Sequence, residues 1–104
     1  MENYFWNTQS GGEKEVYILI IYDIVNNKRR TSFARKMMGY GFRVQKSAFE
    51  ALISKQKYRN LMEEIPGMID MAEDSVRVYR MSGFGEVNMF GQNVKLEKEE
   101  VIII

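Results

Sequence analysis

The chain contains no cysteine and no histidine, and it contains only one proline. The absence of cysteine excludes disulfide bonds and thiolate chemistry. The absence of histidine removes the usual general base at neutral pH and the commonest zinc ligand. Any catalysis must therefore use carboxylates, hydroxyls, basic groups or a hard metal ion bound by oxygen.

Long apolar segments are also missing. No run approaches the roughly 20 residues that a membrane-spanning helix needs, and the polar N-terminus lacks the apolar core of a signal peptide. Together with the absence of cysteine, this predicts a cytoplasmic protein that does not associate with membranes. The 104 residues, 45% of them hydrophobic, are enough for one globular domain.

The net charge of +1 conceals a strong asymmetry along the chain. Residues 24–62 contain ten basic residues and one acidic residue, Glu50, whereas the rest of the chain is predominantly acidic. A basic block in a nearly neutral protein suggests a surface for phosphate groups. A solvated helix face whose counter-charges come from elsewhere in the fold explains the same block equally well.

Hydrophobic patterning predicts an alternation of strands and helices. Residues 16–22 form an unbroken β-branched and aromatic run, typical of a central strand covered on both faces. Residues 28–40 have helical spacing, with the apolar stripe Phe33, Ala34, Met37 and Met38. Residues 42–54 are extended, and their spacing allows either two short strands or one long kinked strand.

The second half repeats this alternation. Ser54 is a plausible N-cap of a second helix, which Pro66 and Gly67 break or end. Strands are predicted at residues 75–81 and 86–90. The order predicts an α+β domain over residues 16–90 with the ferredoxin-like βαββαβ arrangement and additional C-terminal strands, with both helices on one face of an antiparallel sheet. The other face would suit a homodimer.

The two ends of the chain differ from this domain. Residues 1–15 are predicted to be a flexible N-terminal arm, and residues 91–104 a C-terminal tail. The tail ends in the apolar tetrad Val101, Ile102, Ile103 and Ile104 after a charged stretch. Such a tetrad predicts a strand that binds a partner by pairing with a sheet edge.

Asp23 is the most suggestive chemical position. It ends the first predicted strand, and the cations Lys28, Arg29 and Arg30 follow within seven residues. Phosphodiester cleavage needs a hard metal ligand near phosphate-binding cations. Alternatively, Asp23 only shapes the turn. One carboxylate is a poor magnesium site, but a symmetric dimer would bring two copies of Asp23 together.

A second candidate lies in residues 43–47. Strand alternation predicts that Arg43, Gln45 and Ser47 share one face and bind phosphate or sugar oxygens. An ordinary polar sheet face would show the same pattern.

Five blocks of sequence carry a specific resemblance: residues 16–24, 28–30, 40–41, 43–50 and 73–79. In this order they resemble the small CRISPR-associated core protein of spacer acquisition, the second of the universal pair, which partners the CRISPR-associated integrase. The resemblance covers residues 16–90.

This resemblance implies a ferredoxin-like homodimer that binds DNA or RNA and bridges integrase dimers. It also implies Mg²⁺- or Mn²⁺-dependent endonuclease activity on single-stranded RNA or double-stranded DNA. The metal aspartate of the family matches Asp23, one copy from each protomer, and the preceding tyrosine matches Tyr22. Positions linked to activity or substrate contact match Arg30 (or Arg29), Arg43, Ser47 and Phe49.

Another interpretation is a toxin-like ribonuclease of related fold that acts outside CRISPR. The apolar tetrad at residues 101–104 argues against it, because a free ribonuclease has little use for an exposed apolar strand.

Overall fold

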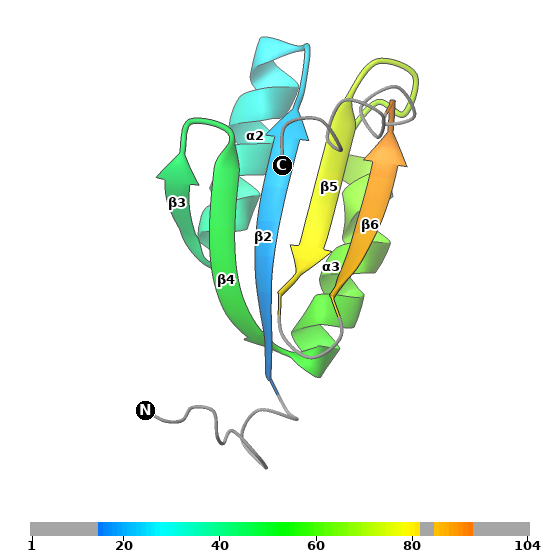
Figure 1. The fold of residues 1–104 in the computed structure, drawn as a ribbon. Helices are drawn as coiled ribbons and strands as arrows, with labels where there is room; N and C mark the ends of the chain where they lie inside the picture. The colour runs from blue at the N-terminus through cyan, green and yellow to red at the C-terminus, as the bar shows by residue number, and fades with distance from the viewer. Residues whose placement is uncertain (1–14, 82–84, 93–104) are drawn as a thin grey trace, which may run out of the picture.

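The computed structural model describes residues 15–81 and 85–92. Figure 1 shows an α+β domain whose elements follow the predicted βαββαβ order with one further strand. The elements are β2 (Glu15–Asp23), α2 (Asn27–Met38), β3 (Phe42–Gln45), β4 (Ala48–Ser54), α3 (Lys55–Met68), β5 (Ser75–Arg80) and β6 (Glu86–Gly91). Residues 42–54 therefore form two strands rather than one.

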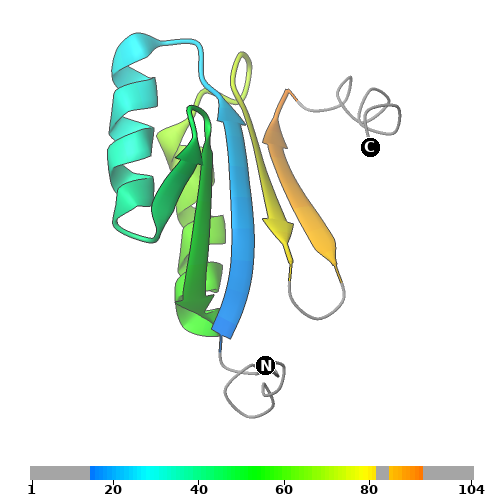
Figure 2. The same cartoon turned by 60° about the vertical axis from the view of Figure 1, so that its left-hand side comes forward.

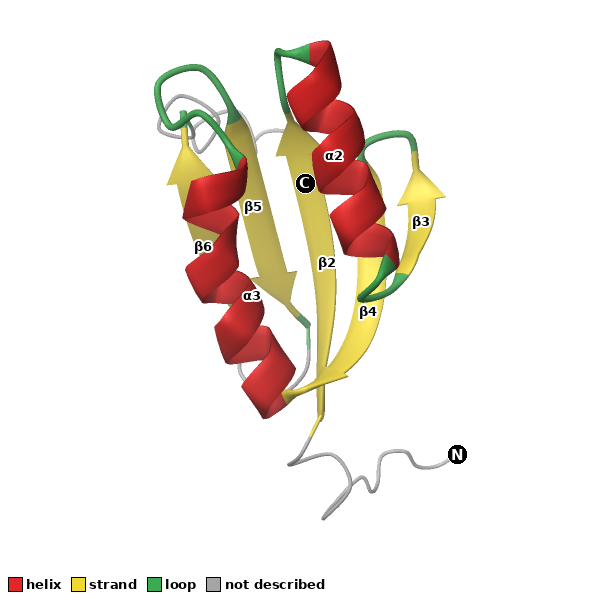
Figure 3. Cartoon of the chain, turned by 180° about the vertical axis from the view of Figure 1, so that it is seen from behind, coloured by secondary structure: helices red, strands yellow, loops and turns green. Residues whose placement is uncertain are grey.

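The sheet has five strands in the order β3-β4-β2-β5-β6, and each pair of neighbours is antiparallel. The longest strand, β2, lies at its centre. Both helices pack on one face, as Figures 2 and 3 show from the side and from behind. This arrangement fits the ferredoxin-like fold predicted from the sequence.

The core lies between the sheet and the two helices. Alternate residues of β2 face it, and Val16, Ile18 and Ile20 are fully buried. They meet side chains from the helices such as Phe33 and Leu61, which are also buried. Burying a side chain of this size contributes roughly 1.5–3 kcal/mol, so the apolar layer stabilises both helices on the sheet.

The prediction that β2 is covered on both faces is wrong for the single chain. The face opposite the helices is open, and large apolar side chains from four strands remain partly exposed on it. They are Leu52 (61% exposed), Phe42 (59%), Val87 (42%), Tyr17 (37%) and Met89 (37%). We call these five residues the open-face patch. The unbroken apolar run of β2 thus has one face against the core and one in this patch.

Helix α2 begins and ends with recognisable caps. The side chain of Asn26 accepts a hydrogen bond from the backbone N–H of Arg29, and Gly39 caps the C-terminus. Phe33, Ala34 and Met37 are buried as predicted. Met38 is 57% exposed, so its assignment to the buried stripe is wrong.

Helix α3 starts as predicted but ends later. Ser54 is its N-cap, and the Ser54 hydroxyl accepts from the N–H of Lys57. Pro66 lies inside the helix, which runs to Met68, so the expected break at Pro66 and Gly67 is wrong. Because Pro66 lies in the last turn, it costs a backbone hydrogen bond only where the helix is about to end.

The predicted domain limits shift slightly. Glu15 already belongs to β2, and Gly91 still belongs to β6. The tetrad Val101–Ile104, predicted to bind a partner, and the rest of the predicted arm lie outside the described residues. No helix in the described ranges is long and apolar enough to cross a membrane.

Candidate nucleic-acid interface

The carboxyl end of β2 positions the central pair of the predicted site. Strand alternation turns Tyr22 toward the helices, where it is buried, and leaves Asp23 exposed on the open face. Within the part of the chain that the structure describes, the Asp23 carboxylate makes no hydrogen bond or ion pair. It is therefore available to a ligand, as the metal interpretation requires, and does not use its side chain to shape the turn.

Arg43 reaches this end of β2 from the edge strand β3. Its Nη2 donates to Tyr22 Oη across 3.3 Å, and its guanidinium carbon lies 5.3 Å from the centre of the Phe49 ring. Tyr22 Oη in turn donates to the carbonyl oxygen of Lys46 at 3.3 Å. Arg43 and Tyr22, which are 21 residues apart, are thus brought together at the end of β2, on the helix side of the sheet, whereas Asp23 lies on the open face.

Phe49 requires a correction. It was expected to contact nucleic acid, but it is fully buried and cannot present its ring to a base. Its ring stacks near Tyr22, with 6.1 Å between the ring centres, and lies beneath Arg43. Phe49 therefore acts in this structure as a support for Arg43.

Ser47 requires another correction. It does not share a strand face with Arg43 and Gln45, because β3 ends at Gln45 and the pairing with β4 is irregular between Arg43 and Gln45. Ser47 lies in the turn between β3 and β4, and its carbonyl oxygen accepts from the N–H of Tyr22. It remains close to the end of β2, through the turn rather than through strand alternation.

The two arginines at the start of α2 are engaged within the chain. Arg29 forms ion pairs with Asp74 (2.6 Å) and Glu73 (2.9 Å). Hydrogen bonding to Asp74 raises the pKa of Arg29 above its ordinary value, with a further contribution from Glu73. Arg30 donates to the carbonyl oxygens of Ile24 (2.8 Å) and Val25 (3.4 Å) and to the side chain of Asn27.

Arg29 and Arg30 therefore stabilise the turn after Asp23, and Arg29 has its charge compensated. Lys28 is exposed beside them, and Lys46 is exposed in the turn between β3 and β4. The two segments that adjoin the carboxyl end of β2 thus each carry an exposed cation, the type of side chain that attracts phosphate groups.

Asp74 is the residue of this region that sequence reasoning missed. It is fully buried and accepts hydrogen bonds from Arg29 Nε (2.6 Å), Val25 N (2.9 Å) and Asp70 N (2.8 Å). Burial alone would raise the pKa of Asp74, but the hydrogen bonds from Arg29, Asp70 and Val25 outweigh this effect and lower it. The signals in the sequence were a carboxylate just before the strand at residues 75–80 and the place of Asp74 in the family-like block at residues 73–79.

A single chain does not supply a complete metal site. Among the described residues, no three carboxylates lie close enough together to hold a metal ion. Asp23 provides the oxygen ligands that Mg²⁺ and Mn²⁺ prefer, but from one side chain only. The residues present fit such an ion only if a second copy of Asp23 approaches the first.

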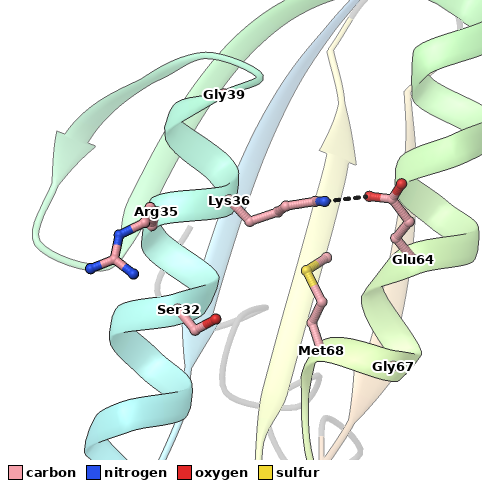
Figure 4. Close-up of a pocket in the computed structure, with 7 residues that line it drawn as sticks. All are labelled: Ser32, Arg35, Lys36, Gly39, Glu64, Gly67 and Met68. Atoms are coloured by element: carbon pink, nitrogen blue, oxygen red, sulfur yellow. Dashed lines mark ion pairs between the residues drawn. The ribbon is translucent and has the colours of Figure 1, made fainter.

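A pocket between the two helices is separate from this end of β2. It lies between α2 and α3, has a volume of about 730 Å³, and contains the ion pair between Lys36 Nζ and Glu64 Oε1 at 3.9 Å (Figure 4). Its lining residues are Ser32, Arg35, Lys36, Gly39, Glu64, Gly67 and Met68. None of the predicted site residues lines it, so this cavity is not the candidate interface.

Comparison with known proteins identifies the family. The profile of the family described as "CRISPR associated protein Cas2" matches residues 16–86, which include the whole of the site described above. The chain belongs to the Cas2 family. This confirms the resemblance seen in the sequence and favours it over a toxin-like ribonuclease outside CRISPR.

Named relatives extend the comparison. A "CRISPR-associated endoribonuclease Cas2" of Mycobacterium tuberculosis is 37% identical over 94 residues, which cover 89% of this chain and 81% of the relative. A "CRISPR-associated endonuclease Cas2 2" of Thermus thermophilus is 30% identical over 83 residues, or 80% of this chain and 92% of that one. A crystal structure of a hypothetical protein from Thermus thermophilus has a TM-score of 0.62 at 29% identity, covering 66% of this chain and 84% of its own.

Proposed function

We propose that this Cas2-family chain is a CRISPR adaptation protein that acts as a homodimer with a ferredoxin-like fold. The homodimer binds DNA or RNA and bridges dimers of the CRISPR-associated integrase. It also has metal-dependent endonuclease activity on single-stranded RNA or double-stranded DNA. The observation that carries the proposal is the carboxylate of Asp23 at the end of β2, which is exposed and has no partner among residues 15–81 and 85–92, within a chain of this family. The printed names of the relatives, endoribonuclease and endonuclease, support the nuclease part.

The open-face patch supports the homodimer. Leu52 and Phe42 are each about three-fifths exposed, at 61% and 59%, and lie on the same side of the sheet as Asp23. Covering contiguous apolar surface stabilises association by roughly 25 cal/mol per Å² before the costs of binding. In a two-fold dimer formed through this face, each Asp23 has a symmetry-related copy on the facing sheet.

Two copies of Asp23 would hold one Mg²⁺ or Mn²⁺. When bound, the ion would activate a water molecule and polarise the scissile phosphate. The residues of this chain supply the remainder of the site. Arg43 is held by Tyr22 and Phe49 on the helix side of the sheet, and with the exposed Lys28 and Lys46 it adds positive charge around the carboxyl end of β2.

The test compares Asp23→Asn with the matched control Glu63→Gln, which removes a charge from the exposed face of α3. Cleavage of single-stranded RNA and of double-stranded DNA is measured separately with Mg²⁺, Mn²⁺ and a chelator. Asp23→Asn should lose cleavage at least a hundredfold with an unchanged circular dichroism spectrum, whereas Glu63→Gln should cleave as the wild type does. Equal cleavage by Asp23→Asn and the wild type would place the activity elsewhere or in a contaminant.

The bridging role has its own test. We expect Asp23→Asn to bind the integrase as tightly as the wild type does, because bridging needs the assembly surfaces rather than the metal. Deleting residues 97–104 should abolish integrase binding and leave cleavage intact. Unchanged integrase binding by this deletion variant would contradict a partner-binding role of the tail.

A further inference from the structure

Asp74 connects three segments of the chain through its side chain. One oxygen, Oδ1, accepts from the N–H of Val25 in the turn after β2, at 2.9 Å. The other, Oδ2, accepts from Arg29 Nε in the first turn of α2 at 2.6 Å and from the N–H of Asp70 after α3 at 2.8 Å. Because the carboxylate is fully buried and its oxygens are engaged by these donors, it fixes the relative positions of the three segments.

The backbone of Asp74 adds a fourth segment. Its carbonyl oxygen accepts from the N–H of Gln92, just after β6, at 2.8 Å. Gly91, the residue before Gln92, has a φ of +82°, and a Cβ atom at position 91 would lie 2.0 Å from the carbonyl oxygen of Asp74. The end of β6 therefore closes onto Asp74 only because residue 91 is glycine. Figure 1 shows these four segments at the end of the sheet where β2 and β6 finish.

This connection lies directly beside Asp23. The residue after Asp74 is Ser75, which is paired with Asp23 across β2 and β5. Val25, which donates to the Asp74 carboxylate, follows Asp23 by two residues. Asp74 thus restrains both the chain that leaves Asp23 and the residue opposite it. Arg30 restrains the same turn through the carbonyl oxygen of Ile24.

Asp23 itself has no side-chain partner among the described residues, so only its backbone determines where its carboxylate points. A metal ion shared by two chains requires each carboxylate to be held within about half an ångström of its productive position. Groups that hydrogen-bond directly to a metal ligand change metal affinity by about 10- to 100-fold when removed. Asp74 acts on Asp23 through the backbone, so its effect should lie at the lower end of that range.

We propose that Asp74 is a positioning residue that sets the direction in which the Asp23 carboxylate meets a divalent cation. The inference rests on the proposed function, and it adds a residue that does not contact the cation. It also assigns a role to Arg29. This arginine acts as the counter-charge that keeps Asp74 ionised in the interior, rather than as a phosphate ligand.

The test measures two quantities. The first is Mn²⁺ binding to the whole protein without nucleic acid, by electron paramagnetic resonance, and the second is the Mn²⁺ concentration that gives half-maximal cleavage. Asp74→Asn should weaken Mn²⁺ binding at least tenfold and raise the half-saturating concentration by a similar factor, with cleavage restored at high Mn²⁺. In the double variant Asp74→Asn/Arg29→Gln, the two amides can bond to each other without charge, so part of the loss should be recovered.

A matched control separates positioning from general stability. Ile53→Ala removes a buried side chain opposite Val16, at the other end of β2 from Asp23. It should lower the melting temperature at least as much as Asp74→Asn does, without changing Mn²⁺ affinity. If Asp74→Asn does not fold, Arg29→Lys loosens the same connection while keeping the charge, and it should weaken Mn²⁺ binding severalfold.

The outcomes separate the two proposals. A wild-type protein that binds no Mn²⁺ would overturn the metal site itself, and the positioning role with it. A wild-type protein that binds Mn²⁺, together with Asp74→Asn and Arg29→Lys variants of unchanged affinity, would overturn only the positioning role of Asp74. Equal weakening by Ile53→Ala would show that stability alone accounts for the effect.

Discussion

Arg43 lies over the buried ring of Phe49, with 5.3 Å between the guanidinium carbon and the ring centre, and donates to Tyr22 Oη. Phe49 and Tyr22 thus hold the exposed guanidinium of Arg43 at a fixed place beside the end of β2. A cation–π contact of this kind is worth about 0.5–1 kcal/mol at an exposed site. Under the proposed function, we expect a larger effect from the restraint itself, because Arg43 would lose less side-chain freedom on binding a phosphate.

Replacing Arg43 tests this arrangement. Arg43→Ala should weaken binding of single-stranded RNA and double-stranded DNA and reduce the slope of log affinity against log salt by about one, as expected for one lost phosphate contact. Arg43→Lys should keep that slope but bind more weakly than the wild type, because an ammonium group cannot reproduce the planar contact with Phe49.

The measurement is fluorescence anisotropy at several salt concentrations. Arg59→Ala serves as a control because Arg59 is an exposed arginine of α3 that bonds only to Gln56 in its own helix among the described residues. Its effect should be smaller at every salt concentration. Equal losses from Arg43→Ala and Arg59→Ala would indicate general attraction by net charge rather than a defined contact.

The open-face patch gives a second prediction. Leu52→Glu introduces a charge at the most exposed apolar position of this patch (61%), so a dimer formed through this face would bury an unpaired carboxylate. We expect sedimentation velocity to show monomers for this variant and dimers for the wild type. Met38→Glu changes an equally apolar and similarly exposed residue (57%) on α2, and it should leave the dimer intact.

Dissociation by Met38→Glu but not by Leu52→Glu would place the dimer interface on the helices. That result would also remove the symmetric approach of two Asp23 carboxylates.

Much of the fold was predictable because its signals are local. The apolar run at residues 16–22, the Ser54 cap and the helical stripe around Phe33 each depend on neighbours within a few residues. Pro66 was misinterpreted because proline removes one backbone donor and crowds the preceding turn, which the helix tolerates here and continues for two more residues. Met38 was misplaced because the stripe of α2 is narrower than its apolar residues suggest.

The candidate site was predictable only where the chain itself brings residues together. Asp23 follows from its place at the end of a strand. The pairing of Arg29 with Asp74 spans 45 residues and depends on the register between β2 and β5, which no local pattern reveals. The burial of Phe49 likewise depends on which face of β4 meets the helices. Sequence reasoning therefore assigned Arg29 and Phe49 to a ligand, although each contacts the protein itself.

The ionisation of Asp74 predicts how stability depends on pH. Its pKa is lowered in the folded protein, so the stabilisation is complete above the unfolded value of about 3.9 and is lost as the pH falls through the folded value. Asp74→Asn should therefore reduce the free energy of unfolding by roughly 1.5–3 kcal/mol at pH 7, as expected for losing hydrogen bonds to a charged group. This difference from the wild type should shrink below about pH 4.

Urea unfolding of both proteins at several pH values and equal concentrations measures this difference. Equal concentrations matter because a dimer gains stability by mass action. A difference that stays constant from neutral pH to the lowest pH would show that the lost contribution does not depend on the charge of Asp74.

Replacing a glycine by alanine should change the stability of the protein in opposite directions at Gly91 and at Gly67. Gly91→Ala forces a side chain into a backbone with a φ of +82°, which costs about 1–2 kcal/mol, and its Cβ would lie 2.0 Å from the carbonyl oxygen of Asp74. Gly67→Ala adds a methyl group within α3 that no atom beyond its chain neighbours and the nearby helix backbone approaches within 4 Å, and it should stabilise the protein by about 0.5–1 kcal/mol.

Urea unfolding should therefore place the midpoint of Gly91→Ala below that of the wild type and the midpoint of Gly67→Ala above it. Because the clash at Gly91 involves the carbonyl oxygen that accepts from Gln92, amide exchange at Gln92 should also accelerate in Gly91→Ala. A Gly91→Ala variant with wild-type stability and unchanged exchange would mean that the end of β6 does not close onto Asp74.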